Sequence, residues 1–328
     1  MPIRIAATAY ALPPDIVSIE SVFENEKARV ETALGPPGCE SRERILAGLG
    51  LSQVRVCGRV DPHTLAMQSA RQALAEADLP ASALDLIIDF STLRGDETGQ
   101  GSFAHKLSAD LGAETSLNFS YRVGGCGGLH LALKTAAALM AADENLRSAL
   151  LVASDTPPSG SRSMLPVTVQ GDAASAVILR AHDGPGPEIL ATEAITLSHL
   201  HDAITIARDH IQVDSARIEN AVKPIYYLNF HRLLHRALDK TSLKLTDVDH
   251  FIYSNISRAD RDGFVKALRL PPERVRPDRL QDLGHTFASD LVINYTDLRR
   301  AGQIHPGEIV LFASAGIGFT WGVTLARA

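Results

Sequence analysis

The chain is poor in the residues that mark several common protein classes. Its 328 residues include three cysteines, an odd and small number that argues against a disulfide framework, so reduced thiols and a cytoplasmic location are expected. The net charge of −6 lacks the basic excess that binding to nucleic-acid phosphates requires. No apolar run reaches the ~20 residues of a membrane span. The opening stretch 1–15 is typical of a β-strand and not of a signal peptide.

Motifs for nucleotides and metals are also missing. No phosphate-binding loop occurs, and no GxGxxG follows an expected strand, so no sequence motif indicates nucleotide binding. His231 and His235 have the i,i+4 spacing of a zinc-binding pair, but their neighbours are Arg232 and Arg236 and no acidic or cysteine partner is nearby. The sequence therefore predicts neither a metal nor a cofactor.

What the chain does contain is an alternation of strand-like and helical segments, which indicates an α/β architecture. Each half shows the same order of a helix, a strand running into a polar or glycine-rich loop, and a further helix. This order favours a duplicated unit with one shared core, divided into residues 1–178 and 179–328. The segments expected to be strands are 84–92 and 148–156, and those expected to be helices are 63–79, 129–142 and 226–241.

The first candidate for chemistry is Cys126, which has two glycines before it and two after it. Glycine lets the backbone turn sharply and lets another molecule approach closely. A cysteine at the start of a helix, here the run 129–142, is favoured as a thiolate. The pattern predicts a nucleophile, and the alternative is a small buried cysteine in a tight turn. Cys39 and Cys57 lack such surroundings and are expected to be structural or incidental.

Two further segments could complete such a site. His285 follows a glycine at the start of an expected helix, and Asp290 lies five residues later, so the carboxylate could hold the imidazole as a general base. The alternative is that His285 caps the helix while Asp290 lies on its solvated face. Gly316 and Gly318 form a turn between two expected strands, which could expose the backbone N–H groups of an oxyanion hole or be a plain hairpin.

A basic stretch lies in the second half of the chain. Its cations share one helical face, which is usually solvated but could dock a small acidic partner such as an acyl carrier protein. The candidate docking residues are Arg258, Arg261, Lys266 and Arg269.

Together these segments resemble the thiolase superfamily, most closely the third class of ketoacyl-carrier-protein synthases, over nearly the whole chain. The stretch 124–140 resembles the family's cysteine turn and buried helix, 150–155 the strand that follows it, 170–179 the GDGAGAVVL segment, and 316–322 the terminal GGGxTWG turn. The resemblance implies an α/β thiolase fold with a duplicated αβαβα five-layer core. It also implies a homodimer, and an oxyanion hole from the backbone N–H groups of Cys126 and Gly318.

The departures from the family pattern bear on the reaction. Ser254 stands where the resembling synthases have a catalytic histidine, and His285 stands at the position of their asparagine. Those two side chains stabilise the enolate that forms when malonyl-carrier loses carbon dioxide, so decarboxylative condensation is not expected here. Arg44 and Gly48 occupy the positions of a tryptophan and an arginine that contact CoA. A carrier-protein thioester is therefore expected ahead of CoA.

The remaining Cys126, His285 and Asp290 resemble an offshoot of the family, the acyltransferases of antibiotic pathways with a GH-x4-D segment. The resemblance implies ping-pong transfer of an acyl group through Cys126 to a hydroxyl, amine or thiol in secondary metabolism, such as polyketide, aminocyclitol or sugar antibiotic biosynthesis. The alternatives are a condensing enzyme with a relocated histidine and a non-catalytic subunit of a heterodimer. Specificity is expected in the loops at 92–106, 157–168 and 199–225, with 198–212 as a helix over the acceptor entrance.

Overall fold

The computed structural model describes residues 2–35, 37–93, 103–121, 124–181, 185–206, 210–276 and 279–328. Within these ranges the main sheet has ten strands, in which two groups of five meet edge to edge through β1 and β10. The strands in order across the sheet are β14 (Val275–Arg276), β13 (Val248–Tyr253), β15 (Ile309–Gly316), β16 (Thr320–Arg327), β10 (Glu188–Thr196), β1 (Ile3–Ala11), β9 (Ala173–Ala181), β6 (Ser148–Asp155), β4 (Leu86–Asp89) and β5 (Leu117–Ser120).

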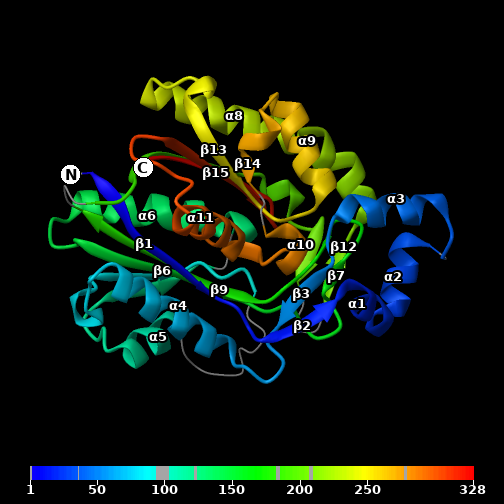
Figure 1. Cartoon of the computed structure of the whole chain (residues 1–328), viewed down its shortest axis with the longest axis horizontal. Coiled ribbons are helices and arrows are strands. Elements are labelled where there is room, and N and C mark those ends of the chain that lie inside the picture. The colour runs from blue at the N-terminus through cyan, green and yellow to red at the C-terminus, as the bar shows by residue number, and fades with distance from the viewer. Residues whose placement is uncertain are drawn as a thin grey trace.

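Helices cover the two groups of strands and also fill the space between them (Figure 1). One outer layer is α4 with α5, the middle layer is α6 with α11, and the other outer layer is α8 with α9. This is the α/β thiolase fold with five layers, as the resemblance implied. The helices of these layers are α4 (Pro62–Glu76), α5 (Phe103–Leu111), α6 (Gly128–Ala142), α8 (Lys223–Thr241), α9 (Arg258–Leu268) and α11 (Asp290–Arg300).

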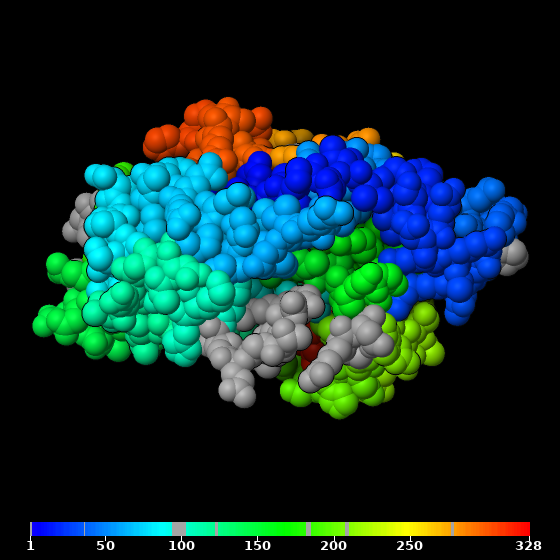
Figure 2. Space-filling model, turned by 90° about the horizontal axis from the view of Figure 1, so that it is seen from below, coloured from blue at the N-terminus to red at the C-terminus, as the bar shows by residue number. Residues whose placement is uncertain are grey.

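Smaller elements gather at one end of the molecule. Seen from below (Figure 2), the blue N-terminal helices and the yellow-green segment after residue 200 lie at the same end, and Arg29 Nη1 donates a hydrogen bond to Ile211 O over 2.7 Å. The elements are β2 (Asp15–Ser18), α1 (Ile19–Asn25), α2 (Lys27–Leu34), α3 (Glu40–Leu49), β3 (Gln53–Val56), β7 (Ser163–Met164), β8 (Thr168–Val169), β11 (Ile204–Ile206), β12 (Ile211–Val213), α7 (Ser215–Arg217), a π-helical turn (Ile218–Val222) and α10 (Leu280–Leu283).

The expected segments follow from local sequence signals. All eight residues of β6 are buried, as its continuous apolar run predicted. Helix α4 begins after Asp61, whose side chain accepts a hydrogen bond from His63 N, with Pro62 at the first helical position. The expected strands at 84–92 and 148–156 and helices at 63–79, 129–142 and 226–241 are confirmed by β4, β6, α4, α6 and α8.

The middle layer holds the two groups of strands together. Along their shared edge, β1 and β10 are paired through the single register pair Arg4↔Glu188. One apolar cluster, by contrast, joins α6, α11 and strands of both groups, and it includes Leu133, Leu291 and Tyr295. Burial of each such side chain contributes about 1.5–3 kcal/mol to the free energy of folding, whereas a single hydrogen bond between strands contributes about 1 kcal/mol. Packing in the middle layer therefore dominates the cohesion of the molecule.

Several sequence expectations concern whole-chain properties. All three cysteines are free thiols. No helix among the described residues is long and apolar enough to cross a bilayer. The same residues contain no group of three histidine, cysteine or acidic side chains that could hold a metal ion. The division into halves of residues 1–178 and 179–328 stays a prediction, and its boundary falls inside β9.

Candidate active site

Cys126 lies in a backbone turn that only glycines could form. It belongs to the 3₁₀ turn Gly125–Gly127, which leads directly into α6, and its side chain is buried. Gly124 and Gly125 have φ angles of +106° and +51°. A Cβ on Gly316 would lie 1.9 Å from Gly124 O and 2.4 Å from Cys126 N, so the glycine turn after β15 packs backbone against backbone on the cysteine turn.

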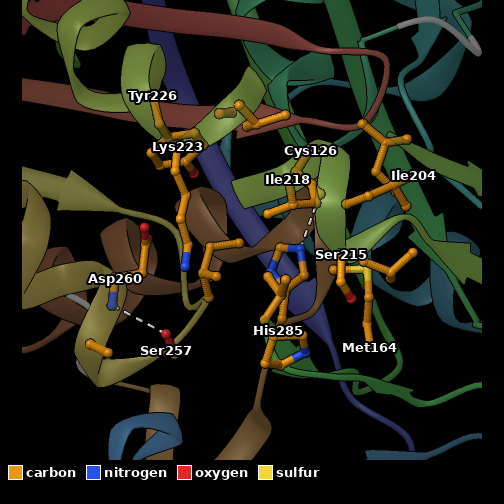
Figure 3. A pocket seen from close by; sticks show the side chains of 18 of the residues that line it. Cys126, Met164, Ile204, Ser215, Ile218, Lys223, Tyr226, Ser257, Asp260 and His285 are labelled. Carbon is orange, nitrogen blue, oxygen red and sulfur yellow. Dashed lines mark hydrogen bonds between the residues drawn. The ribbon is translucent and has the colours of Figure 1, made fainter. Parts of the chain in front are cut away.

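His285 reaches the cysteine from the other half of the chain. Its Nε2 lies 3.0 Å from Cys126 Sγ (Figure 3). The backbone of His285 is clamped on both sides, because its N–H donates to Val169 O and its carbonyl accepts from Gly171 N, each over 3.0 Å. Gly284 has φ +63°, and a Cβ there would meet Val169 O at 2.6 Å. The imidazole is thus held in place by β-type contacts rather than by a mobile loop.

Asp290 completes the group as the first residue of α11. Its Oδ2 lies 2.6 Å from His285 Nδ1 and accepts a hydrogen bond from Asn255 N over 2.7 Å. Its Oδ1 accepts two more, from the N–H and the Oγ1 hydroxyl of Thr286, each over 2.7 Å. Phe287, at φ +56°, reverses the chain between the histidine and the aspartate. Asp290 is fully buried, so the alternative that placed it on a solvated helix face is wrong.

The electrostatics of this group favour the protonated form of His285. Burial lowers the pKa of His285, but the negative charges of Cys126 and Asp290 outweigh burial and raise the pKa of His285 well above its ordinary range. The site therefore favours a protonated imidazole, with Nδ1 facing Asp290 and Nε2 facing the sulfur.

A cavity of about 630 Å³ opens beside the sulfur and the imidazole. In Figure 3, Met164, Ile204 and Ser215 lie on one side of Cys126 and His285, while Lys223, Ser257 and Asp260 lie on the other. One wall is apolar and suits an acyl chain, and its residues include Met164, Val167, Ile204, Val213, Ile218, Val222, Phe287 and Phe319. Polar groups also line the cavity, namely Arg44, Ser215, Glu219, Lys223, Tyr226, Tyr227, Ser257 and Asp260.

Two profiles of one protein family match the sequence. Residues 123–198 match 3-oxoacyl-[acyl-carrier-protein] synthase III, and residues 238–328 match the C-terminal part of the same synthase. Together the matches span just over half of the chain and include Cys126, His285 and Asp290. The chain belongs to the synthase III family.

Similar proteins place the chain within this family. The beta-ketoacyl-[acyl-carrier-protein] synthase III of Erythrobacter litoralis is 28% identical, with 98% of each chain covered. The structure of the acyltransferase ChlB3 is 25% identical with a TM-score of 0.83, over 100% of this chain and 98% of that one. The structure of 3-oxoacyl-[acyl-carrier-protein] synthase III from Aquifex aeolicus has a TM-score of 0.84 at 21% identity, over 99% and 100% of the two chains, and shares the fold.

The structure also places the positions at which this chain departs from the synthase III pattern. Ser254 ends β13 in a buried position, and its Oγ has no hydrogen-bond partner among the described residues. His285 is therefore the one histidine among the residues that line the cavity. Arg44 and Gly48 of α3 both line the same cavity. No tryptophan is present among the lining residues of the described chain to stack on an adenine ring.

The basic residues of α9 do not form one common docking face. Arg258 is exposed and packs against Gly50, where an added Cβ would meet Arg258 Cβ at 2.8 Å. Arg261 donates hydrogen bonds to carbonyls of its own chain, at 2.6 Å and 3.3 Å, and so turns inward. Lys266 and Arg269 are exposed toward the opposite end of the helix, ~12 Å and ~16 Å along its axis from Arg258. Carrier docking at this helix stays a prediction, with Arg258 nearest to the cavity.

The expected helix over the acceptor entrance is wrong. Residues 204–206 and 211–213 form the strands β11 and β12 of a hairpin, and residues 207–209 lie outside the described chain. β-branched isoleucines and a valine in these strands favour extended backbone. This segment nevertheless lies next to the cavity, as expected, because Ile204 and Val213 line the cavity. Of the other expected specificity loops, 157–168 contributes Met164 and its neighbours to the cavity wall, and residues 94–102 of 92–106 lie outside the described chain.

Sequence reasoning missed Asp260, which lines the cavity from the first turn of α9. Burial raises the pKa of Asp260 to about 6, although the hydroxyl groups of Tyr253 and Tyr227 and the positive charge of His285 act in the opposite direction. The spacing could have revealed it, because Asp260 precedes Phe264 and Leu268 by one and two helical turns, and both of these are buried.

Asp260→Asn is expected to stabilise the protein at neutral pH. Between about pH 4, where an ordinary aspartate ionises, and about pH 6, where Asp260 ionises in the folded chain, folding favours the protonated carboxyl. The stability of the wild type therefore falls across this range relative to the variant, and the difference is constant above it. Because Asp260 is partly open to solvent, the advantage of the variant at pH 7 is about 1–2 kcal/mol.

Urea unfolding of both proteins from pH 4 to pH 8 measures this difference. Asp262→Asn, at an exposed position of the same helix, is the control and is expected to follow the wild type. A difference that does not grow between pH 4 and pH 6 would contradict the assignment of a raised pKa to Asp260.

Proposed function

We propose that the chain is an acyltransferase that works through an acyl-enzyme on Cys126. The supporting observation is the contact of Cys126 Sγ with His285 Nε2 at 3.0 Å, with His285 Nδ1 held by Asp290 at 2.6 Å. This is the arrangement by which a nucleophile, an acid–base group and an orienting carboxylate act in acyl transfer.

In the first half-reaction, the Cys126 thiolate attacks the carbonyl carbon of an acyl thioester. The backbone N–H groups of Cys126 and Gly318 would hold the oxyanion. As the carbon–sulfur bond of the donor breaks, the leaving thiolate takes the Nε2 proton of His285 and departs as a thiol. Cys126 then carries the acyl group, and His285 is neutral.

In the second half-reaction, neutral His285 accepts a proton from a hydroxyl, amine or thiol of the acceptor as that group attacks the acyl-enzyme. The bond between the acyl carbon and Cys126 breaks, and the thiolate–imidazolium pair is restored. No carbon dioxide is released. We propose that the donor is a carrier-protein thioester or a CoA thioester and that the reaction belongs to secondary metabolism. The similarity to the acyltransferase ChlB3 supports the acyl-transfer step.

A condensing reaction is the second candidate, because relatives that match this chain over 98% of their length are beta-ketoacyl-[acyl-carrier-protein] synthases III. Against it, the position of the family's catalytic histidine is Ser254, which does not line the cavity. One imidazole, already engaged with Cys126 and Asp290, leaves an enolate without its second donor. A silent subunit of a heterodimer would not need the buried, fully hydrogen-bonded Asp290.

Intact mass after incubation with acyl-CoA and acyl-carrier thioesters, malonyl included, tests the proposal. An acyl adduct on Cys126 that amines or sugars discharge without loss of carbon dioxide supports acyl transfer. Release of carbon dioxide with a lengthened chain would identify a condensing enzyme instead. Absence of any adduct would overturn both readings and favour the silent subunit.

We also propose a homodimer. Strand β5 ends the sheet, and its Leu117 is 50% exposed although it is a large apolar side chain. An unpaired sheet edge with such a residue favours pairing with a second copy. Light scattering on the purified chain distinguishes a dimer from a monomer.

A further inference from the structure

Asp260 is fixed on the inner face of α9. Ser257 caps the helix, and its Oγ accepts a hydrogen bond from Asp260 N over 3.2 Å. Tyr227 Oη donates toward Asp260 Oδ1 and toward its backbone carbonyl, with a distance of 3.1 Å to each. A Cβ on Gly263 would lie 2.2 Å from Tyr227 Oη, so the tyrosine hydroxyl occupies the space that a larger residue would need. The carboxylate therefore has a defined position on the cavity wall.

The second oxygen of Asp260 is less well satisfied. Oδ2 is buried and has no hydrogen bond of ordinary length and angle among the described residues, although the Tyr253 hydroxyl is close enough to stabilise the charged carboxylate. Unsatisfied polar atoms are rare in protein interiors and are concentrated where a protein binds or reacts. Because Asp260 lines the cavity, its incompletely satisfied oxygen favours a role in holding a ligand.

Asp260 differs from the other charged side chains at the cavity in its partners, although the cations Arg44 and Lys223 also line the cavity. Two carboxylates line the cavity, and one of them, Glu219, forms an ion pair with Lys223 one helical turn away. Asp260 forms no ion pair among the described residues, and the cation whose charge reaches it is His285. In Figure 3, Asp260 lies across the cavity from Cys126 and His285, on the same side as Lys223.

We propose that Asp260 selects the acyl acceptor by charge, favouring an acceptor that carries an ammonium group and disfavouring one that carries a carboxylate. The inference rests on the acyl transfer proposed above and names the class of its acceptor. An ammonium next to Asp260 would compensate the lone carboxylate and donate a hydrogen bond to it. A malonyl carboxylate in the same space would meet a like charge. Asp260 thereby also disfavours the substrate of a condensing reaction.

The test measures binding without turnover. Hexylamine, hexan-1-ol and hexanoate serve as probes of equal chain length, and protection of Cys126 from alkylation by iodoacetamide, read by peptide mass, gives the dissociation constant of each. The wild type is expected to bind hexylamine at least ~10-fold more tightly than hexanoate, with hexan-1-ol between them. Asp260→Asn keeps the shape and the acceptor for Tyr227 but removes the charge, so the preference is expected to fall to about twofold or less.

Asp262→Asn is the matched control, because it removes an exposed carboxylate from the same helix and is expected to keep the full preference. Equal binding of hexanoate and hexylamine by the wild type, or an unchanged preference in Asp260→Asn, would overturn the proposal. Circular dichroism of the variants shows whether each is folded.

Acylation of Cys126 by thioesters, measured on the same samples, separates this inference from the proposed function. A charge preference that depends on Asp260 in a protein that no thioester acylates would refute acyl transfer and leave the ammonium site standing. Acylation without any charge preference would refute only the role of Asp260.

Discussion

Replacing Cys126 with alanine is expected to abolish the acyl adduct and to lower acyl transfer at least ~10⁴-fold. The sulfur is the atom that forms the covalent intermediate, and no other thiol is near the imidazole. Cys57, the other buried cysteine, has its pKa raised to about 12 by burial and by the charge of Asp172, which keeps it a thiol. Intact mass and steady-state transfer rates with the same thioester measure the effect.

Two controls make this result specific. Cys39→Ala removes a cysteine that lies outside the cavity, and it is expected to be acylated and to turn over like the wild type. Cys126→Ser keeps a smaller nucleophile in the same turn and is expected to fall between the wild type and the alanine variant. Transfer by Cys126→Ala within ~10-fold of the wild-type rate would show that the reaction does not pass through this sulfur.

Asp290→Asn is the second large effect, with an expected loss in transfer rate of ~10³–10⁴-fold. Both carboxylate oxygens face donors only, since Oδ2 meets His285 Nδ1 and Asn255 N, and Oδ1 meets two groups of Thr286. An amide NH₂ at either place would oppose another donor. The negative charge that helps to raise the pKa of His285 is lost as well, so the ring is held less firmly and its pKa falls.

The readout for Asp290→Asn includes the pH profile, which a purely structural role would not move. As the pKa of His285 falls, the basic limb that reports loss of its proton is expected to shift to lower pH. Asp297→Asn is the control, because Asp297 lies on the same helix and contacts Tyr10 and Arg279 away from the cavity. An unchanged profile together with a rate within ~10-fold of the wild type would mean that Asp290 does not orient the histidine.

The parts of the site that were predictable are those with a local sequence signal. Four glycines around Cys126 indicated a strained turn at a helix start, and the structure has that turn, with positive φ at Gly124 and Gly125. The five-residue spacing of His285 and Asp290 was compatible with a contact between them, but the spacing alone did not distinguish this contact from a solvent-facing Asp290. The resemblance to known synthases joined these distant segments, because contacts between residues 159 positions apart leave no periodic trace.

The parts that were not predictable depend on tertiary packing. The segment 198–212 was expected to be a helix, because the strands β11 and β12 are short, pair with each other and give no long alternation in the sequence. Helix α9 was interpreted as a docking surface because of its basic residues, whereas the charged residue of this helix that lines the cavity is Asp260. Whether Arg261 faces solvent or its own backbone is likewise decided by the carbonyls of Pro272 and Val275, which no helical pattern reveals.

The middle layer both holds the two groups of strands together and positions the candidate site. Cys126 immediately precedes α6 and Asp290 begins α11, and these same helices hold the two groups of strands together. A substitution that loosens this layer, however far from the cavity, would change the distance from sulfur to imidazole before it unfolds either half. Substitutions in the interior of α6 and α11 are therefore expected to affect the reactivity of Cys126 as well as the stability of the fold. A chimaera of two relatives is therefore expected to keep the contact between sulfur and imidazole only when its α6 and α11 pack well against each other.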